Sequence, residues 1–278
     1  MTDEDGVTEP GRTGEGGSGQ DSPFPAVRAI GMDAPARWLR AGWRDLRAAP
    51  VPSLFYGVVL AAMGFALAHA PGSGAIELAL VTGFLLVGPF LLMGLYDIAQ
   101  RVARGEDVMI GPTMTAWKAN VQSIGFYAII LALLLAVWIR ISIVVVALFF
   151  EGAAPSVAAL AADAVRNPET LTFVAAYAAA GCGFALFVFA TSVVSLPMLY
   201  DRPQMDTLTA MITSFNALRR NFWPMLAWAA TIVALTALGF ATYYVGLVVA
   251  LPLVGLATWH AYRDVVAPDG ARSEETPT

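Results

Sequence analysis

The chain has 278 residues, of which 58% are hydrophobic and 13% are charged, and its mean hydropathy is +0.66. A soluble domain carries about 25% charged residues, so this composition excludes a water-soluble globular protein. The single cysteine, Cys182, and the two histidines, His69 and His260, exclude an internal disulfide, a thiolate metal cage and haem or multinuclear metal chemistry. We therefore expect no cofactor.

The net negative charge of the protein comes from the two ends of the chain. Residues 1–21 and 267–278 hold nine of the 21 acidic residues and two of the 16 basic ones, so the net charge of −5 becomes +2 without them. Both ends are too polar to bury enough surface to fold. We expect a disordered acidic Gly/Pro/Ser-rich cytoplasmic tail at residues 1–29, a six-span membrane domain at 30–266 and a disordered tail at 267–278. The N-terminus lacks the pattern of a secretory signal peptide, so the first span is expected to act as an uncleaved anchor.

A basic amphipathic segment precedes the first long apolar run. Leu39, Trp43 and Leu46 share one face at helical spacing, and four arginines share a neighbouring face. These arginines are Arg37, Arg40, Arg44 and Arg47. The pattern predicts a helix in the headgroup layer, where the arginines contact anionic lipid or where the helix is merely structural.

Six apolar runs approach the roughly 20 residues that cross a hydrocarbon core. They are Val51–Ala70, Ile76–Tyr96, Ser123–Phe149, Leu171–Met198, Phe222–Phe240 and Tyr243–Trp259. Each must be helical in lipid, because an unsatisfied peptide group there costs several kcal/mol. The sequence therefore predicts an all-α polytopic membrane protein with six transmembrane helices.

The distribution of basic residues orients these spans. Lys and Arg cluster before the first span, in the second and fourth loops and after the last span, whereas the first, third and fifth loops hold only Arg166. This alternation follows the positive-inside rule. We expect both termini in the cytoplasm.

The approaches to the three predicted hairpins resemble one another. They are Ala41 to Asp45, Thr115 to Asn120 and Asn216 to Asn221, each with a basic residue near its centre. One interpretation is a threefold repeat of an amphipathic helix plus a transmembrane hairpin. The alternative is that interfacial residues look alike at every membrane boundary.

Arg140 is the one basic residue inside a predicted span. A charge at the bilayer centre costs about 2.5 kcal/mol or more, so this side chain needs a partner or an escape to water. We expect either an ion pair with Glu77, at the outer end of the second span, or snorkelling of Arg140 to the outer surface.

Two carboxylates and one imidazole close the three returning spans. If the repeat is real, Asp97, Asp201 and His260 approach one another near the cytoplasmic surface. They are weak candidates for a divalent metal site or a proton relay, and interfacial ion pairs with nearby arginines are the simpler interpretation.

No enzyme signature is present. The chain has no Gly-x-Ser-x-Gly elbow, no His-Glu-x-x-His pair and no phosphate-binding loop. We expect no enzymatic activity and no catalytic residue.

Four motifs carry a resemblance to a known family. They are Gly83 to Phe90, Gly94-Leu95-Tyr96-Asp97, Ser192 to Met198 and Ala257 to Arg263. On these motifs the chain resembles the Domain of Unknown Function 2189 family of predicted bacterial integral membrane proteins, over Ile30 to Val266. The resemblance implies a bacterial inner-membrane setting and no established mechanism. Members sometimes carry the label cytochrome c oxidase subunit I, but that activity needs more histidine ligands than the two present here.

Three functions remain open from the sequence. The first is a non-enzymatic membrane scaffold or assembly component, which should be packed through its centre. The second is a small-solute or ion transporter with a polar cavity at the repeat axis, and the third is an oxidase-associated protein. The expected partner is the lipid bilayer with its anionic headgroups. No nucleic-acid partner is expected, and the sequence does not identify a protein partner.

Overall fold

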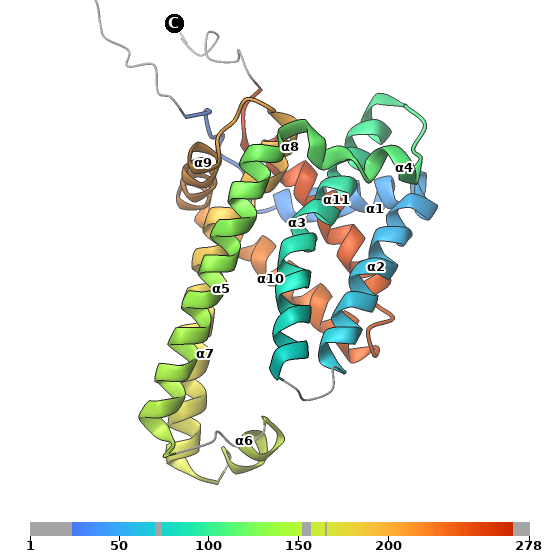
Figure 1. Ribbon diagram of the computed structural model, residues 1–278. Coiled ribbons are helices and arrows are strands. Elements are labelled where there is room, and N and C mark those ends of the chain that lie inside the picture. Colours follow the sequence, from blue (N-terminus) through green and yellow to red (C-terminus); the bar gives the residue numbers. More distant parts are fainter. Residues whose placement is uncertain (1–23, 70–73, 152–156, 165, 269–278) are drawn as a thin grey trace, which may run out of the picture.

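The computed structural model describes residues 24–69, 74–151, 157–164 and 166–268, and within these the side chains of 74–86, 157, 158 and 161 are not described. Every regular element in this part of the chain is helical, which confirms the predicted all-α class (Figure 1). The elements are α1 (Ala34–Ala48), α2 (Pro50–Ala68), α3 (Gly74–Arg104), α4 (Ile110–Thr113), η1 (Ala116–Asn120), α5 (Val121–Phe149), α6 (Val157–Asp163), α7 (Pro168–Ser192), α8 (Ser195–Asp201), α9 (Thr207–Arg220), α10 (Phe222–Ala241) and α11 (Leu247–Val265).

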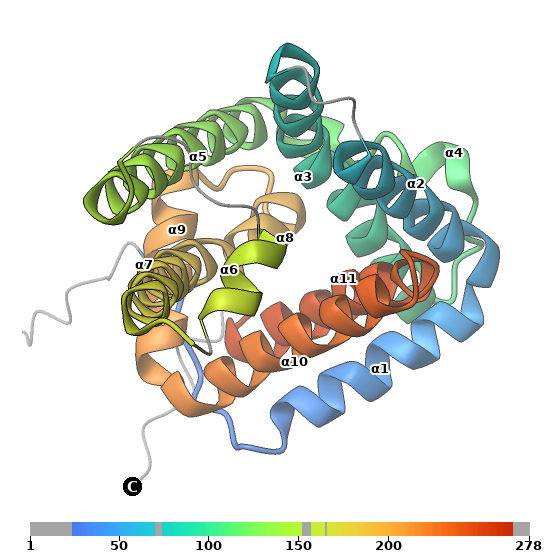
Figure 2. The same ribbon diagram turned by 90° about the horizontal axis from the view of Figure 1, so that it is seen from below.

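Long helices pair as hairpins around a common centre (Figure 2). The pairs are α2 with α3, α5 with α7, and α10 with α11. The α5–α7 hairpin reaches farther than the others (Figure 1), because α5 has 29 residues and α2 has 19. We call the end of the bundle that holds α1, α8 and α9 the inner end.

Four helical stretches of the described chain are long and apolar enough to cross a membrane. They are Pro50–Ala68, Ile110–Phe149, Pro168–Asp201 and Phe222–Ala241, with mean hydropathies of 1.9, 2.9, 2.0 and 1.7. The most apolar window, in the stretch that contains α5, is 0% buried inside the protein, which is the inverse of a soluble helix and fits a lipid-facing one.

The other two predicted spans correspond to α3 and α11 but are not among these four. The side chains of the first half of α3 are not described. The last turns of α11 carry His260, Arg263 and Asp264, so this helix is less apolar than the runs above. The count of six spans therefore remains a prediction.

The last hairpin turns later than predicted. Tyr243 and Tyr244 lie in the turn with φ of 51° and 68°, and α11 begins at Leu247 rather than at Tyr243. The Thr242 hydroxyl accepts a hydrogen bond from the Gly246 N–H at 2.8 Å. The two tyrosines occupy the tip, as expected, but in left-handed turn conformation and not in a helix.

The two ends of the described chain meet at the inner end. Val27 and Val266 form an antiparallel bridge, and the Asn221 side chain accepts from the Ile30 N–H at 2.9 Å and donates to the Arg28 carbonyl at 2.9 Å. Residues 26–28 of the expected N-terminal tail are thus anchored to the helical domain. Because both ends lie on one side, the chain crosses the bundle an even number of times.

Helix α1 buries a different face from the one predicted. Trp38, Gly42 and Leu46 are buried, whereas Trp43 is 45% exposed. A Cβ atom at Gly42 would lie 2.8 Å from the Ala257 backbone nitrogen, so α1 packs directly on α11. The buried face differs from the predicted one because Gly42, which has no side chain, lets α1 approach α11 closely. The hydrophobic pattern that we used for the prediction does not detect this effect.

Candidate functional site

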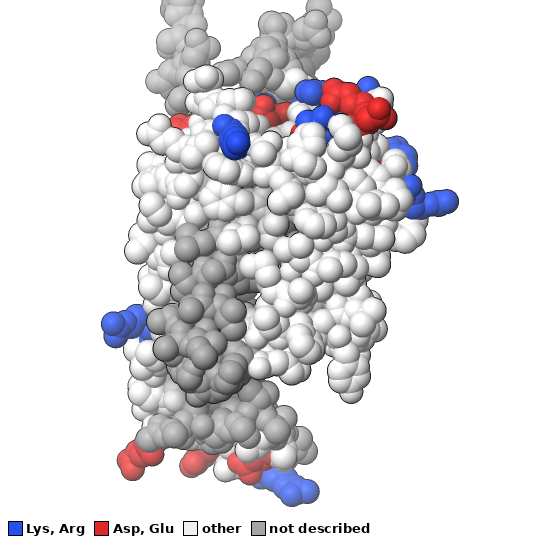
Figure 3. All heavy atoms as spheres, turned by 45° about the vertical axis from the view of Figure 1, so that its right-hand side comes forward, with Lys and Arg blue, Asp and Glu red and all other residues white. Residues whose placement is uncertain are grey.

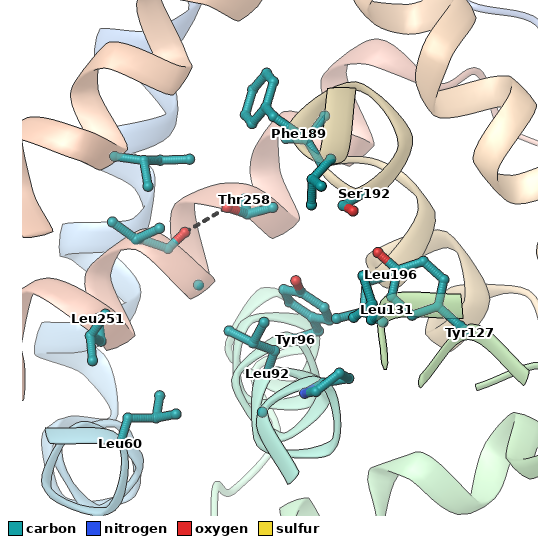
Figure 4. A pocket seen from close by; sticks show the side chains of 17 residues that line it. Leu60, Leu92, Tyr96, Tyr127, Leu131, Phe189, Ser192, Leu196, Leu251 and Thr258 are labelled. Carbon is teal, nitrogen blue, oxygen red and sulfur yellow. Dashed lines mark hydrogen bonds between the residues drawn. The ribbon is translucent and has the colours of Figure 1, made fainter. Parts of the chain in front are cut away.

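A cavity of about 430 Å³ lies between the hairpins (Figure 4). Its walls come from α2, α3, α5, α7, α8, α10 and α11. No charged residue is among the described residues that line it. The volume falls in the range of about 300–1,000 Å³ that is usual for small-molecule sites.

One helix break and two intrahelical prolines lie at or beside this cavity. Pro89 lies inside α3, Pro252 lies inside α11, and α7 ends at Ser192 before α8 resumes at Ser195. Proline removes an intrahelical hydrogen bond and bends the helix. A Cβ atom at Gly88, beside Pro89, would meet nothing within 4 Å, so the wall is open at this point.

Two hydroxyls satisfy backbone carbonyls at the α7–α8 break. The Thr191 hydroxyl donates to the Phe187 carbonyl at 3.1 Å, and the Ser195 hydroxyl donates to the Thr191 carbonyl at 2.5 Å. The Ser192 hydroxyl does not act in the same way, because its Oγ makes no hydrogen bond of normal geometry among the described residues. It lines the cavity instead.

Four hydroxyls gather at the inner end of the cavity. They belong to Tyr96, Tyr127, Ser192 and Thr258 (Figure 4), from α3, α5, α7 and α11. Tyr96 and Tyr127 are only 2% and 1% exposed. An apolar cavity with a few convergent polar groups is the usual form of a ligand site.

An aromatic layer closes the cavity on its inner side. The Trp259 ring stacks on Tyr96 with a centroid distance of 6.2 Å, and Tyr200 meets Trp259 edge-on at 5.7 Å. The Tyr200 hydroxyl then donates to Asp97 Oδ1 at 2.7 Å. The aromatic rings therefore separate the cavity from a polar layer.

The polar layer joins two of the predicted site residues. Gln100 accepts from the Tyr200 hydroxyl at 3.1 Å and donates to Asp201 at 3.3 Å, so Asp97 and Asp201 belong to one network. Arg101 donates to Asp97 at 2.8 Å, and this hydrogen bond raises the pKa of the Arg101 guanidinium above its usual value. Both carboxylates are engaged by protein donors.

His260, the third candidate ligand, lies elsewhere. Its Nε2 is 2.5 Å from Oδ2 of Asp45, and no group of three or more His, Cys, Asp or Glu residues in the described chain could hold a metal ion. Asp97 and Asp201 are joined through Gln100, but His260 pairs with Asp45, so the three side chains do not meet. The weak metal site is therefore not assembled.

Asp45 is a buried partner of His260 that we did not identify from the sequence. It is 1% exposed and lies on the same face of α1 as Trp38 and Gly42. That helical phase is the signal that could have found it, since a carboxylate three or seven residues from buried positions is itself expected to be buried.

The basic residues of α1 have unequal surroundings. Arg37 forms ion pairs with Asp33 and Asp264, and the hydrogen bond to Asp33 raises the pKa of Arg37. Arg40, Arg44 and Arg47 are exposed. Of these three, Arg44 has only a long contact of 3.7 Å to Asp45. Three of the four arginines that we predicted to contact lipid therefore lack a close protein partner among the described residues.

Arg140 is exposed on α5 among exposed apolar residues such as Ile143 and Val144. It forms no ion pair with a residue whose side chain is described. The Glu77 side chain lies outside the described residues, so the predicted pair stays a prediction. Arg140 is 19 residues beyond Val121, which at about 1.5 Å per residue places it near the outer edge of a 30 Å core.

Charge is concentrated at the two ends of the molecule. On the face seen in Figure 3, acidic and basic side chains gather at the inner and outer ends, with a wide band of other residues between them and a basic group at one edge. Such a band is what a bilayer requires.

The comparisons with known proteins agree with this picture. Residues 77–201, from α3 to α8, match the sequence model of a family described as Predicted integral membrane protein (DUF2189). This match confirms the resemblance for the three motifs between Gly83 and Met198, while the motif from Ala257 to Arg263 lies outside the matched residues. No curated protein and no solved structure matches the chain.

Proposed function

We propose that this multi-pass integral membrane protein binds a membrane-soluble, apolar molecule in the cavity between its hairpins, without converting it chemically. The observation that carries the proposal is the lining of the cavity, which includes Leu60, Leu92 and Leu131 and no charged side chain among the described residues. Burial of apolar surface is the main source of affinity at such a site.

The cavity differs from what the scaffold and transporter hypotheses require. A scaffold packed through its centre leaves no space of about 430 Å³. A hydrated ion or polar solute would lose its water in this cavity without gaining ligands, which is strongly unfavourable. Neither His69 nor His260 lines it, so haem chemistry of an oxidase gains no support either.

Six crossings, with both termini in the cytoplasm of a bacterial inner membrane, form part of this proposal. The bridge between Val27 and Val266 supports an even number of crossings. Helices α1, η1 and α9 each precede a hairpin, which supports a threefold repeat of approach helix plus hairpin. The basic loops support the inner position of this end.

The inner end also contacts anionic lipid in this proposal. Arg40, Arg44 and Arg47 are exposed beside the exposed Trp43 ring, and an aromatic ring with adjacent cations is typical of the headgroup layer.

Photolabelling of the full-length protein in phosphatidylcholine nanodiscs tests the binding. The probe is a long-chain alkane that carries a diazirine, and the labelled residues are mapped by mass spectrometry. Wild type should be labelled at cavity residues such as Leu131 and at lipid-facing residues such as Leu133, which is 61% exposed.

Filling the cavity should remove only the first set of labels. Gly88→Leu adds a side chain where a Cβ meets open space, and Leu92→Trp is a second filling variant. Gly183→Leu is the matched control, since Gly183 is equally open but outside the cavity. The proposal fails if wild type is labelled only at lipid-facing positions, or if both filling variants keep cavity labelling.

A further inference from the structure

We infer that the ligand is a neutral amphiphile with a hydroxyl at one end, and that this end lies against Tyr96, Ser192 and Thr258 at the inner end of the cavity. This inference rests on the proposed function, because it assigns the chemical class and the orientation of the bound molecule.

Unused hydrogen-bonding capacity at the inner end is the first argument. The Tyr96 phenol is 2% exposed and makes no hydrogen bond to another described residue. The Ser192 Oγ, which Figure 4 shows pointing toward the Tyr127 hydroxyl, makes no hydrogen bond of normal geometry in the described chain, so its contact with Tyr127 leaves it free to bond a further group. Buried hydroxyls without partners are unfavourable, so a polar group of the occupant is expected to meet them.

The hydrogen-bonding capacities of Tyr96 and Thr258 favour a hydroxyl as the polar group of the ligand. Thr258 already donates to the Val254 carbonyl at 2.7 Å, so toward the cavity it only accepts. Tyr96 has its proton available to donate. A ligand hydroxyl that donates to Thr258 and accepts from Tyr96 satisfies both, whereas a ketone or ester oxygen satisfies only Tyr96.

The absence of charge in the lining selects a neutral molecule. Asp97 adjoins Tyr96 in sequence, but its carboxylate is held by Tyr200 and Arg101 beyond the aromatic layer. A carboxylate or an ammonium group in the cavity would therefore be buried without a counter-ion among the described lining residues, which is strongly unfavourable.

The positions of the lining residues along the helices set the orientation. Tyr96 and Thr258 are near the inner ends of α3 and α11, while Gly88 and Leu251 lie about two turns farther out and present no polar side chain. The hydroxyl end therefore points inward and the chain extends toward the outer leaflet.

Competition in the same nanodiscs tests the inference. A diazirine-bearing long-chain alcohol labels the cavity, and unlabelled alkane, alcohol and carboxylate of equal chain length compete for it. The alcohol should compete about fivefold better than the alkane for each hydrogen bond it makes, and the carboxylate should compete worst.

Removal of one phenol should erase part of this preference. Tyr96→Phe should weaken competition by the alcohol about fivefold and leave competition by the alkane unchanged. Tyr177→Phe is the matched control, because its hydroxyl donates to Ser142 outside the cavity. Equal competition by alkane and alcohol, or best competition by the carboxylate, overturns the inference while the proposed function stands. Absence of competition by every chain overturns both.

Discussion

The Tyr200 hydroxyl donates a hydrogen bond of 2.7 Å to Oδ1 of Asp97, and this bond ties α8 to α3 directly beneath the aromatic layer that closes the cavity. Asp97 is 6% exposed and receives a second bond from Arg101. The inner end of the cavity is therefore held by a charge-assisted contact between two residues that are 103 positions apart in the sequence.

Tyr200→Phe should lower the free energy of unfolding by about 1.5–3 kcal/mol, the range for a hydrogen bond to a charged group. Denaturant unfolding in detergent measures this loss. Tyr243→Phe serves as the control, since Tyr243 is 87% exposed at the hairpin tip and should change little. A loss of equal size in the two variants would contradict the role of the Asp97 contact.

Asp45→Ala should destabilise the protein by about 1–3 kcal/mol, because it leaves the His260 ring without its buried partner. Asp33→Ala removes an acidic residue of the same kind from an exposed pair with Arg37 and should cost much less, because water screens an exposed ion pair. The midpoints of thermal unfolding of the two variants, measured under the same conditions, compare these two losses of stability. Equal midpoints would mean that the Asp45–His260 contact is energetically unimportant.

Gly57→Ala should destabilise the protein by about 1–3 kcal/mol or prevent folding, since overpacking strains a close contact. Its Cβ would lie 1.9 Å from the Val248 carbonyl oxygen, where α2 crosses α11. Gly125→Ala, in α5, meets nothing within 4 Å and should be neutral or stabilising. Expression and monodispersity in detergent report the difference, and a well-folded Gly57→Ala protein would show that the two helices are farther apart.

Asp206 should make the stability of α9 depend on pH. Its side chain accepts from the Thr209 N–H at 2.9 Å as an N-cap, and hydrogen bonding to Thr209 lowers its pKa below 3.8. A lowered folded-state pKa means that the stabilisation is complete above the unfolded value and is lost as the pH falls through the folded value. Asp206→Ala should therefore cost about 1 kcal/mol at neutral pH and progressively less below pH 3.8. Asp206→Asn, which keeps the cap without the charge, should show no such dependence, and a constant penalty for Asp206→Ala across the acid range would rule out the charged cap.

Arg140 should mark the outer boundary of the bilayer. In a Cys182→Ala background, Arg140→Cys should react with a membrane-impermeant thiol reagent added from outside, because this position is exposed near the outer edge of the core. Leu133→Cys, about two turns deeper in α5, should not react. If Arg140→Cys is protected and Glu77→Gln is as destabilising as Arg140→Leu, the buried ion pair is correct and snorkelling is wrong.

The sequence by itself determined the helical class and most helix positions. Lipid forces every apolar run to satisfy its own peptide groups, so runs such as Ser123–Phe149 could be assigned without tertiary information, and α5 ends at the predicted Phe149. The Asp206 N-cap is local in the same sense, because its hydrogen bond joins residues three positions apart. The boundary at Tyr243 was wrong because a turn with positive φ depends on how the two helices pack and not on hydropathy.

Only the tertiary structure decided which polar groups meet and where space remains. Asp97, Asp201 and His260 all lie in the C-terminal parts of their helices, but the rotation of each helix about its axis joins the first two through Gln100 and brings His260 to Asp45. That rotation is set by close contacts such as Gly42 against Ala257. The cavity likewise arises from gaps between helices, and a gap has no local sequence signal, because it depends on side chains from seven helices at once.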